Sequence, residues 1–266
     1  MEQHKRLGLA LGSGGPRGLA HIGVIKTIRD EGIAIHAIAG VSAGALVGGL
    51  YCAGGSIEKL LSLTSSFGYR EFFSVFFAPT FSSGLVRTDK ALSFLENVLG
   101  GITIEELAVP FTAVATDIQT GEPVVIRSGS LARAIVASVS IPLIFEPSSY
   151  MERFFVDGGV TMPVPVDVVK SMNVDRVLAV NLEHYREPAQ SGKQEKPNAA
   201  QVTARTIDIL KHKLADYTAQ GADIILEPSF SFSSLDMRRF VHGNDIVEVG
   251  ISQTRTIIPK LKEIVS

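Results

Sequence analysis

Short apolar segments alternate with helical patterns along this chain, and the alternation restricts the possible folds more than any other feature. Leu7–Leu11 and Arg176–Leu182 are nearly uninterrupted apolar runs of strand length, which is typical of strands buried on both faces of a sheet. The pattern predicts an α/β fold in which helices cover both faces of a mostly parallel sheet. The expected strands are Leu7–Leu11, Ile33–Ala39, Phe111–Ile118, Val124–Arg127, Phe154–Val156, Arg176–Leu182 and Ala222–Leu226.

The expected helices follow from their apolar spacing and from the signals at their ends. After Gly18, leucine and isoleucine recur at every third residue as far as Ile28, and Gly32 then stands where a helix-ending glycine is expected. The other helical patterns are Ala45–Cys52, Ser130–Ser138, Pro163–Met172, Gln201–Tyr217 and Ile246–Ile264. Residues 200–266 are therefore predicted to supply helical packing elements rather than chemistry.

Composition and charge exclude several classes of protein. The 25 Lys plus Arg and 27 Asp plus Glu give a net charge of −2, without the basic excess of a nucleic-acid binder, so no nucleic-acid partner is expected. The single cysteine, Cys52, rules out an intrachain disulfide and fits a reducing compartment. The first apolar run is too short for a signal peptide, and no apolar stretch is long enough to span a membrane. We expect a cytoplasmic protein.

A candidate nucleophile lies in the pentapeptide Gly40-Val41-Ser42-Ala43-Gly44, which has the form G-x-S-x-G. This motif places a serine on a tight turn between a strand and a helix, with its hydroxyl exposed above the sheet edge. Gly40 and Gly44 are small enough to allow that turn, and the flanking segments match a strand and a helix. Ser42 is therefore either a nucleophile or part of a structural turn of small residues.

The glycine-rich segment Gly12–Gly18 (GSGGPRG) follows the first expected strand. One interpretation is a dinucleotide-binding turn, but Arg17 stands where the third glycine of that motif belongs, and no strand ends in an acidic residue about 20 positions later. The other is an oxyanion hole, in which consecutive backbone N–H groups stabilise the charge that develops on a carbonyl oxygen. Pro16 has no N–H and cannot contribute to it. A plain connecting turn is the third possibility.

A serine nucleophile needs a base, and Asp157-Gly158-Gly159 directly follows the expected strand Phe154–Val156. A carboxylate at a strand end, followed by two glycines that leave space, is well placed to accept a serine proton. A loop aspartate that turns the chain is the alternative. None of the six histidines lies in a catalytic motif, and His21 is expected to be a packed or a surface residue inside the first helix.

Taken together, the three segments resemble the bacterial patatin-like phospholipases. The order is a glycine-rich loop, then G-x-S-x-G, then D-G-G, each after an expected strand. The resemblance covers at least residues 7–182, with weaker similarity to the C-terminus. The matching segments are LALGSGGPRGLAHIGV at 9–24, AGVSAGAL at 39–46, ATDIQTGE at 115–122, ASVSIPLIFEP at 137–147 and FVDGGVTMPVPV at 155–166.

The resemblance implies a single catalytic domain over residues 1–266, with a three-layer α/β/α fold. It further implies hydrolysis of acyl lipids by a Ser–Asp dyad without histidine, here Ser42 and Asp157, with no metal and no cofactor. An oxyanion hole would come from Gly14 and Gly15, with Arg17. The substrate would be an acyl lipid or another ester, and contact with a membrane surface would be peripheral. The remaining motif residues, Gly12, Ser13, Gly18, Gly40, Gly44, Gly158 and Gly159, would be structural.

Two alternatives to a hydrolase stay open from the residues. One is a catalytically silent lipid-binding or regulatory protein with the same fold, and the other is a nucleotide binder that uses Gly12–Gly18. The loop also departs from the family at Ser13, where a glycine is usual. Serine keeps its backbone N–H, but it would be strained if that position required a positive φ.

Two further segments stand apart from the strand and helix pattern. Residues 187–198 (EPAQSGKQEKPN) are polar and poor in apolar side chains, which predicts a mobile surface loop. Phe67–Phe81 holds six of the 14 phenylalanines of the chain. It is either a core helix or flap closed over its own sheet, or an apolar lid or lipid-facing surface beside the active site.

Overall fold

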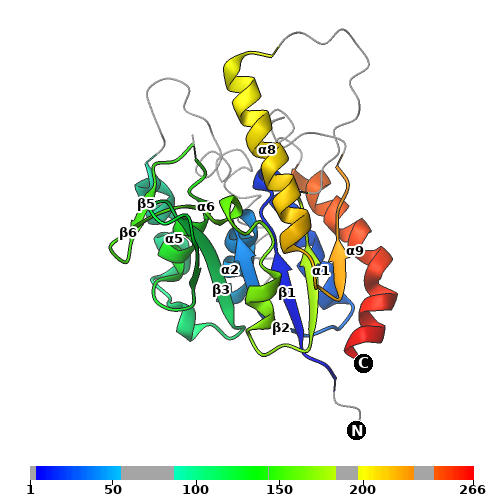
Figure 1. Cartoon of the computed structure of the whole chain (residues 1–266). Helices are drawn as coiled ribbons and strands as arrows, with labels where there is room; N and C mark the ends of the chain where they lie inside the picture. The colour runs from blue at the N-terminus through cyan, green and yellow to red at the C-terminus, as the bar shows by residue number, and fades with distance from the viewer. Residues whose placement is uncertain (1–3, 55–86, 143, 184–196, 231–242) are drawn as a thin grey trace.

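The computed structural model describes residues 4–54, 87–142, 144–183, 197–230 and 243–266 of the chain. The segment Phe67–Phe81 lies outside the described residues, and so do residues 187–196 of the predicted surface loop. The described residues form one α/β unit around a single sheet, with the N-terminus below the sheet in the view of Figure 1.

The sheet has eight strands in the order β5-β6-β3-β2-β1-β7-β8, with β4 paired to β3 outside this path. The five strands from β3 to β8 in that order are parallel, whereas β4, β5 and β6 are antiparallel to their neighbours. The strands are β1 (Leu7–Leu11), β2 (Ile35–Val41), β3 (Phe111–Asp117), β4 (Pro123–Ile126), β5 (Ser148–Tyr150), β6 (Arg153–Asp157), β7 (Arg176–Val180) and β8 (Ile224–Leu226).

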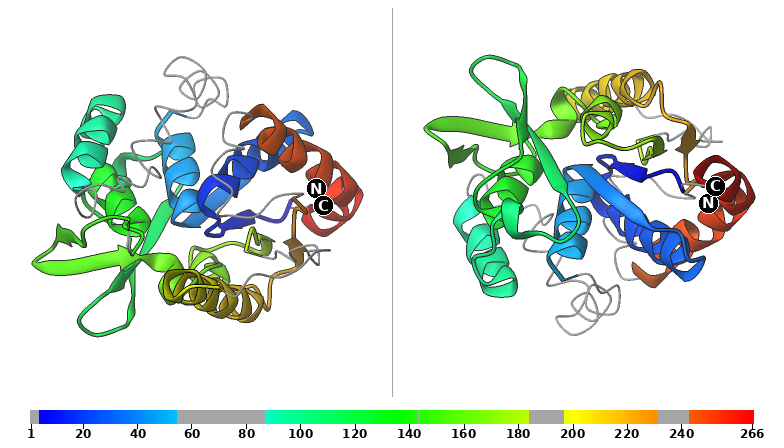
Figure 2. Two further views of the ribbon diagram at one scale, coloured as in Figure 1. Left: turned by 90° about the horizontal axis from the view of Figure 1, so that it is seen from above. Right: turned by 90° about the horizontal axis from the view of Figure 1, so that it is seen from below.

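Helices cover both faces of this sheet, which confirms the α/β class and the three-layer arrangement (Figures 1 and 2). One face carries α1, α2, α5, α6 and α9, and the other carries α7 and α8. Among the described residues no helix is long and apolar enough to cross a membrane. The helices are α1 (Ala20–Asp30), α2 (Ala43–Gly54), α5 (Thr88–Leu99), α6 (Leu131–Val139), α7 (Val166–Lys170), α8 (Ala199–Thr218) and α9 (Gly243–Val265).

The strand β1 has the predicted bounds and the other strands predicted from apolar runs are present with shifted ends, but β5 and α5 were not predicted. The strand β5 is only three residues long and contains two serines, so it has no apolar signal. The amphipathic helix α5 buries only Ala91 and Leu95, a stripe too narrow to stand out from the sequence. The helix predicted over Pro163–Met172 is shorter, Val166–Lys170, because two prolines near its start lack the N–H that a helix interior needs.

The strands β2 and β6 meet end to end along one edge of β3. Residue Val41 of β2 pairs with Val114, and Asp157 of β6 pairs with Ala115, the next residue of β3. The register of β4 overlaps both of these pairings, so β4 occupies the opposite edge of β3. Because β6 runs antiparallel to β2, the last residues of both strands point toward the same place.

The helices α1 and α9 cross with their backbones in contact. A Cβ on Gly23 would lie 2.2 Å from the carbonyl oxygen of Val247, and a Cβ on Gly250 would lie 2.2 Å from that of Ala20. No side chain fits at either position without a shift of the facing helix. The C-terminal helix therefore joins the main core.

We expect Gly250→Ala to lower the free energy of unfolding by about 1–3 kcal/mol, the usual cost of overpacking a tight contact. The clash should outweigh the gain of roughly 1 kcal/mol that alanine gives over glycine inside a helix. Chemical denaturation of both proteins measures the difference. Arg255→Ala, at an exposed position of the same helix, is the control and should change stability little. A stabilised Gly250→Ala protein would mean that the helices are not this close.

Candidate active site

Ser42 lies on a strained turn between β2 and α2. Its φ is +54°, a backbone conformation that residues other than glycine seldom adopt, and it is only 1 % exposed. The Ser42 N–H donates to the hydroxyl of Ser138 at 2.9 Å, and that hydroxyl donates to the carbonyl of Val114 at 2.6 Å. A serine of α6 thus ties this turn to β3.

The glycines of the pentapeptide allow α2 to begin in contact with the end of β1. A Cβ on Gly44 would lie 2.1 Å from the carbonyl oxygen of Leu11, so only glycine fits there. Gly40 is similarly close to the first turn of α2, and Gly18 packs against Ala43, the residue after Ser42. These approaches bring Ser42 next to the glycine-rich loop that follows β1.

Asp157 ends β6 and is buried, with 2 % of its surface exposed. Its Oδ1 accepts a hydrogen bond from the Gly159 N–H at 2.7 Å, whereas its Oδ2 is buried without a hydrogen-bond partner among the described residues. Burial raises the pKa of this carboxyl group, because a charge in a water-poor site is poorly solvated. The Ser42 hydroxyl is close enough to lower the same pKa, although the contact does not reach ordinary hydrogen-bond geometry.

The turn after Asp157 sits directly against β3. A Cβ on Gly158 would lie 2.1 Å from the carbonyl oxygen of Val114, so this position also requires glycine. The hydroxyl of Thr116 donates to the main-chain carbonyl of Asp157 at 3.0 Å. Asp157 is therefore held against β3. Because β2 lies along the same edge of β3, Ser42 and Asp157 come together.

The loop Gly12–Gly18 has two backbone N–H groups without an acceptor among the described residues. The Gly12 N–H donates to Val180 at 3.0 Å and the Ser13 N–H donates to Pro163 at 2.8 Å, so both are occupied. The next two N–H groups, of Gly14 and Gly15, have no acceptor in the part of the chain that the structure describes. Gly15 has φ +51°, which starts the 3-10 helix Gly15–Leu19.

Ser13 fits the loop without strain, because it is not among the residues with positive φ. Its side chain is fully buried and its hydroxyl donates to the carboxylate of Glu183 at 2.8 Å. This hydroxyl also lies beside Gly159, where an added Cβ would be 3.0 Å from it. The departure from glycine at this position therefore adds a bond between the glycine-rich loop and the segment after β7.

Glu183 is the centre of a charged network that the sequence did not indicate. Its carboxylate accepts from Arg17 at 2.9 Å and from Lys211 of α8 at 3.0 Å, besides the Ser13 hydroxyl. The cations and the hydroxyl lower the pKa of Glu183 to about 2, despite the opposing effect of burial. Arg17 is itself 2 % exposed and its backbone N–H donates to Gly14. It anchors the loop through its side chain.

The same network acts electrostatically on Asp157. The ammonium of Lys211 lowers the pKa of Asp157 and Glu183 raises it, but burial is the largest influence and the pKa is raised overall. Neither Glu183 nor Lys211 lies in a recognisable motif. Their only sequence signal is position: Glu183 follows β7 at the carboxyl edge of the sheet, where ligand-binding residues of parallel sheets gather.

No described histidine is hydrogen-bonded to Ser42 or to Asp157. His21 is fully buried, and its Nε2–H donates to the Gly12 carbonyl at 2.8 Å. His212 is bonded through Nδ1 to the main-chain carbonyl of Glu183 at 2.8 Å. Of the two positions expected for His21, packed or surface, the structure has the packed one, and the ring also supports the glycine-rich loop.

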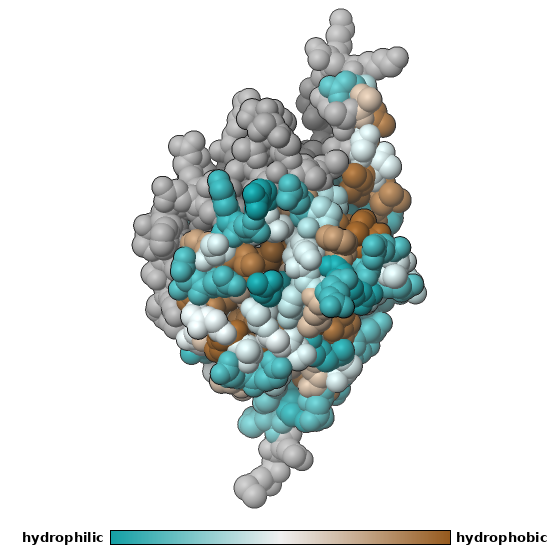
Figure 3. Space-filling model, turned by 90° about the vertical axis from the view of Figure 1, so that its left-hand side faces the viewer, coloured by the Kyte–Doolittle hydropathy of each residue, from teal (hydrophilic) through white to brown (hydrophobic). Residues whose placement is uncertain are grey.

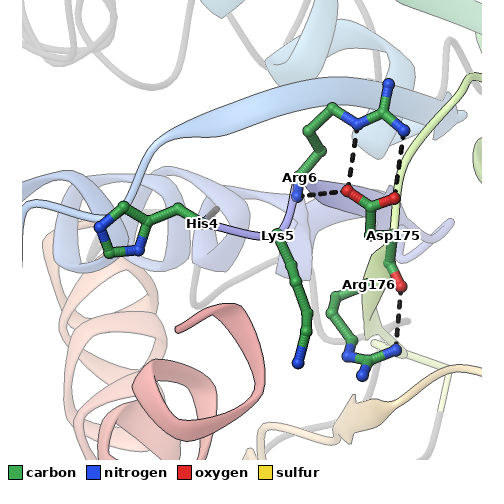
Figure 4. Close-up of a pocket in the computed structure, with 5 residues that line it drawn as sticks. All are labelled: His4, Lys5, Arg6, Asp175 and Arg176. Carbon is green, nitrogen blue, oxygen red and sulfur yellow. Dashed lines mark hydrogen bonds and ion pairs between the residues drawn. The ribbon is translucent and has the colours of Figure 1, made fainter. Parts of the chain in front are cut away.

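No metal site competes with this cluster in the described part of the chain. Among the described residues no group of three His, Cys, Asp or Glu could hold a metal ion. A pocket of about 730 Å³ lies at the amino ends of β1 and β7, lined by His4, Lys5, Arg6, Asp175 and Arg176 (Figure 4). There Arg6 binds both carboxylate oxygens of Asp175, so its charge is already neutralised, and the pocket is at the edge opposite Ser42.

Comparison with known proteins gives one consistent family. The sequence model of the patatin-like phospholipases matches residues 9–170. An uncharacterized NTE family protein of Mycobacterium tuberculosis is 39% identical over 177 residues, which cover 66% of this chain and 49% of that protein. A patatin-like phospholipase domain-containing protein of Caenorhabditis elegans is 30% identical over 188 residues, 68% of this chain and 14% of that protein. The chain therefore spans about half the length of the mycobacterial relative and a smaller part of the nematode one.

A solved structure supports the same fold. VipD from Legionella pneumophila superposes with a TM-score of 0.56 at 12% sequence identity, covering 97% of this chain and 67% of that chain. At such low identity the likeness concerns the fold alone. The three-layer arrangement seen here is patatin-like.

We expect His21 to titrate near pH 4, because burial lowers its pKa to about 4 from an ordinary 6.5. Between pH 4 and pH 6.5, His21 is therefore protonated in the unfolded chain but neutral in the folded chain. This histidine therefore contributes to a fall in stability as the pH drops from about 6.5 to 4, by roughly 3 kcal/mol in total. The imidazole proton shifts in NMR spectra of the folded protein, compared with the same protein in denaturant, measure both pKa values. A folded pKa near 6.5 would contradict the buried, neutral ring.

Proposed function

The chain belongs to the patatin-like phospholipase family, and we propose that it is a serine acyl hydrolase that cleaves acyl esters of lipids. Ser42 is the nucleophile and Asp157 is the base. The observation that carries the proposal is the meeting of these two residues. A serine with φ +54° stands beside a buried carboxyl group whose Oδ2 lacks a hydrogen-bond partner among the described residues.

Acylation begins when Ser42 attacks the ester carbonyl carbon. Oδ2 of Asp157 accepts the hydroxyl proton as the bond from Oγ to carbon forms. A solvated aspartate is a weak base for a hydroxyl, and the raised pKa of the buried Asp157 improves the match. Collapse of the tetrahedral intermediate breaks the bond to the alcohol oxygen, which takes the proton from Asp157 and leaves. The acyl group remains on Ser42.

Deacylation repeats these steps with water as the nucleophile. A water molecule gives a proton to Asp157 while its oxygen attacks the acyl carbon. When this second intermediate collapses, Ser42 leaves and regains its proton from Asp157, and the carboxylic acid is released. No protein group other than the dyad has to gain or lose a proton over the cycle.

The N–H groups of Gly14 and Gly15 stabilise the negative oxygen in both tetrahedral intermediates. Their availability supports this role, because the preceding two N–H groups are bonded to Val180 and Pro163. Loss of one such donor typically costs about 10²–10³ in rate. Arg17 contributes by holding the loop through Glu183, so we assign it a positioning role in the oxyanion hole.

Ser42→Ala and Asp157→Asn should each abolish ester hydrolysis and leave the protein folded. The two losses should be strongly non-additive, because the residues act as one unit. Turnover of a soluble short-chain ester by both single variants and the double variant measures this. If Asp157→Asn kept most of its activity, the base would be another group, and the histidines that follow it in the chain, His184, His212 and His242, would be next to test.

A fluorophosphonate probe separates the hydrolase from the two alternatives. An activated Ser42 should form a covalent adduct with the probe, which mass spectrometry of the intact protein and of its peptides detects. A silent lipid-binding protein or a nucleotide binder would not be labelled at Ser42. The Ser42→Ala protein is the control for labelling at other serines.

Lys211→Met should shift the acid limb of the pH profile of kcat/KM to higher pH. The Lys211 ammonium lowers the pKa of Asp157, so its loss raises that pKa further. Because the base must be ionised, activity then disappears at a higher pH as the solution is acidified. Lys211→Arg should restore much of the original profile.

The neighbouring exposed residue supplies the matched control for this experiment. Lys213→Met removes the same charge from α8 at an exposed position and should leave the pH profile unchanged. An equal shift in both variants would mean that only the net charge of the helix matters. Unchanged profiles in both would show that Lys211 does not act on the base.

A further inference from the structure

The helix α8 (Ala199–Thr218) presents its large apolar side chains to solvent. Ten large apolar residues are exposed among the described residues, and five of them lie on this one helix. Leu210 is 63% exposed and Tyr217 is 70% exposed. The other three are Val202, Ile207 and Ile209.

Large apolar side chains lie on the outward face of α8 and small or charged ones on its inward face, which is the reverse of the usual arrangement. At roughly 100° per residue, Val202, Ile209, Leu210 and Tyr217 fall within an arc of about 100°. The opposite side holds the small, buried Ala215 and also Lys211, which is bonded to Glu183. An ordinary surface helix buries its large apolar side chains, so this arrangement calls for an external partner.

The helix is attached to the body through its second half and projects with its first. Lys211 and His212 bond to Glu183, and the Thr218 hydroxyl accepts from the Val164 N–H at 3.1 Å. The first half rises beyond the carboxyl edge of the sheet, the edge at which Ser42 and Asp157 meet (Figure 1). Hydrophobic side chains follow this projecting helix at the upper right of the space-filling view (Figure 3).

The charges on the exposed part of α8 indicate what kind of surface it meets. Among the described side chains of the helix, the two exposed charged residues are Arg205 and Lys213, and both are cationic. The acidic Asp208 is partly exposed, and the side chain of Asp216 is 40% exposed and lies 3.8 Å from the Nε2 of His212. Apolar side chains combined with exposed cations are the features of helices that bind at the boundary between lipid headgroups and acyl chains.

We propose that the outward α8 face, formed by Val202, Ile209, Leu210 and Tyr217 with Arg205 and Lys213, docks on an anionic lipid surface. The inference rests on the proposed function, because α8 rises beside the edge at which Ser42 and Asp157 lie, and a lipid surface held by this helix would bring an aggregated acyl substrate near them. The helix supplies this contact independently of the chemistry. Binding can therefore be measured on a protein that does not turn over.

Tryptophan fluorescence gives a direct test, since the chain contains no tryptophan. In the Ser42→Ala background, Leu210→Trp should show a blue-shifted emission with vesicles containing phosphatidylglycerol and a smaller shift with pure phosphatidylcholine. Ile225→Trp, at a 41% exposed position of β8, is the matched control and should not respond. Equal shifts at both positions, or no shift at Leu210→Trp, would overturn the proposal.

A double variant tests the consequence for turnover. Ile209→Ser with Leu210→Ser should keep its melting temperature and its rate on a soluble short-chain ester, and should lose vesicle binding by tenfold or more. A protein that binds vesicles but hydrolyses no ester would refute the proposed function and leave the docking surface intact. Unchanged vesicle binding by the double variant would overturn the proposal. A Leu210→Trp emission shift that depends on protein concentration in the absence of vesicles would also overturn it, because the face would then bind a second copy of the chain.

Discussion

The candidate site depends on the backbone pairing of β3 with two other strands, at Val114 and Ala115. On one edge of β3, β2 ends opposite Val114 and β6 ends opposite Ala115. The same strand provides the carbonyl that accepts from Ser138 and contacts Gly158. Two strands of opposite direction share one edge, so the residues after Val41 and at Asp157 are brought together by backbone hydrogen bonding. Their separation does not depend on flexible side chains.

Burial and the nearby Lys211 ammonium have opposite effects on the pKa of Asp157, and both serve the proposed chemistry. Removing water raises the pKa of the carboxyl group and so its basicity, but on its own it would favour the protonated form, which cannot act as a base. The nearby Lys211 ammonium limits that rise. Glu183 holds Lys211 in place and also binds Ser13 and Arg17 of the glycine-rich loop. One carboxylate therefore links the proposed oxyanion donors to the electrostatics of the proposed base.

The helix α8 connects this network to the surface. Its inward side supplies Lys211, and its outward side exposes Leu210 and Tyr217. A contact at the outward face would act on the same rigid helix that carries Lys211. The proposed lipid docking and the proposed chemistry thus share one structural element, although each can be measured without the other.

The sequence by itself determined the α/β class, most of the strands and the motif residues, because apolar runs and glycine positions are local signals. It could also name Ser42, Asp157 and Gly12–Gly18 as candidates for one site. Only the tertiary structure decided how they meet, since strand direction and shared edges involve partners distant in the chain; β6 is antiparallel, which its short apolar run does not reveal. Glu183 and Lys211 could not be predicted either, because their roles come from contacts between segments that no local pattern records. The outward apolar face of α8 could not be predicted for a similar reason: a helical period gives the spacing of apolar residues but does not tell which side of the helix faces the core.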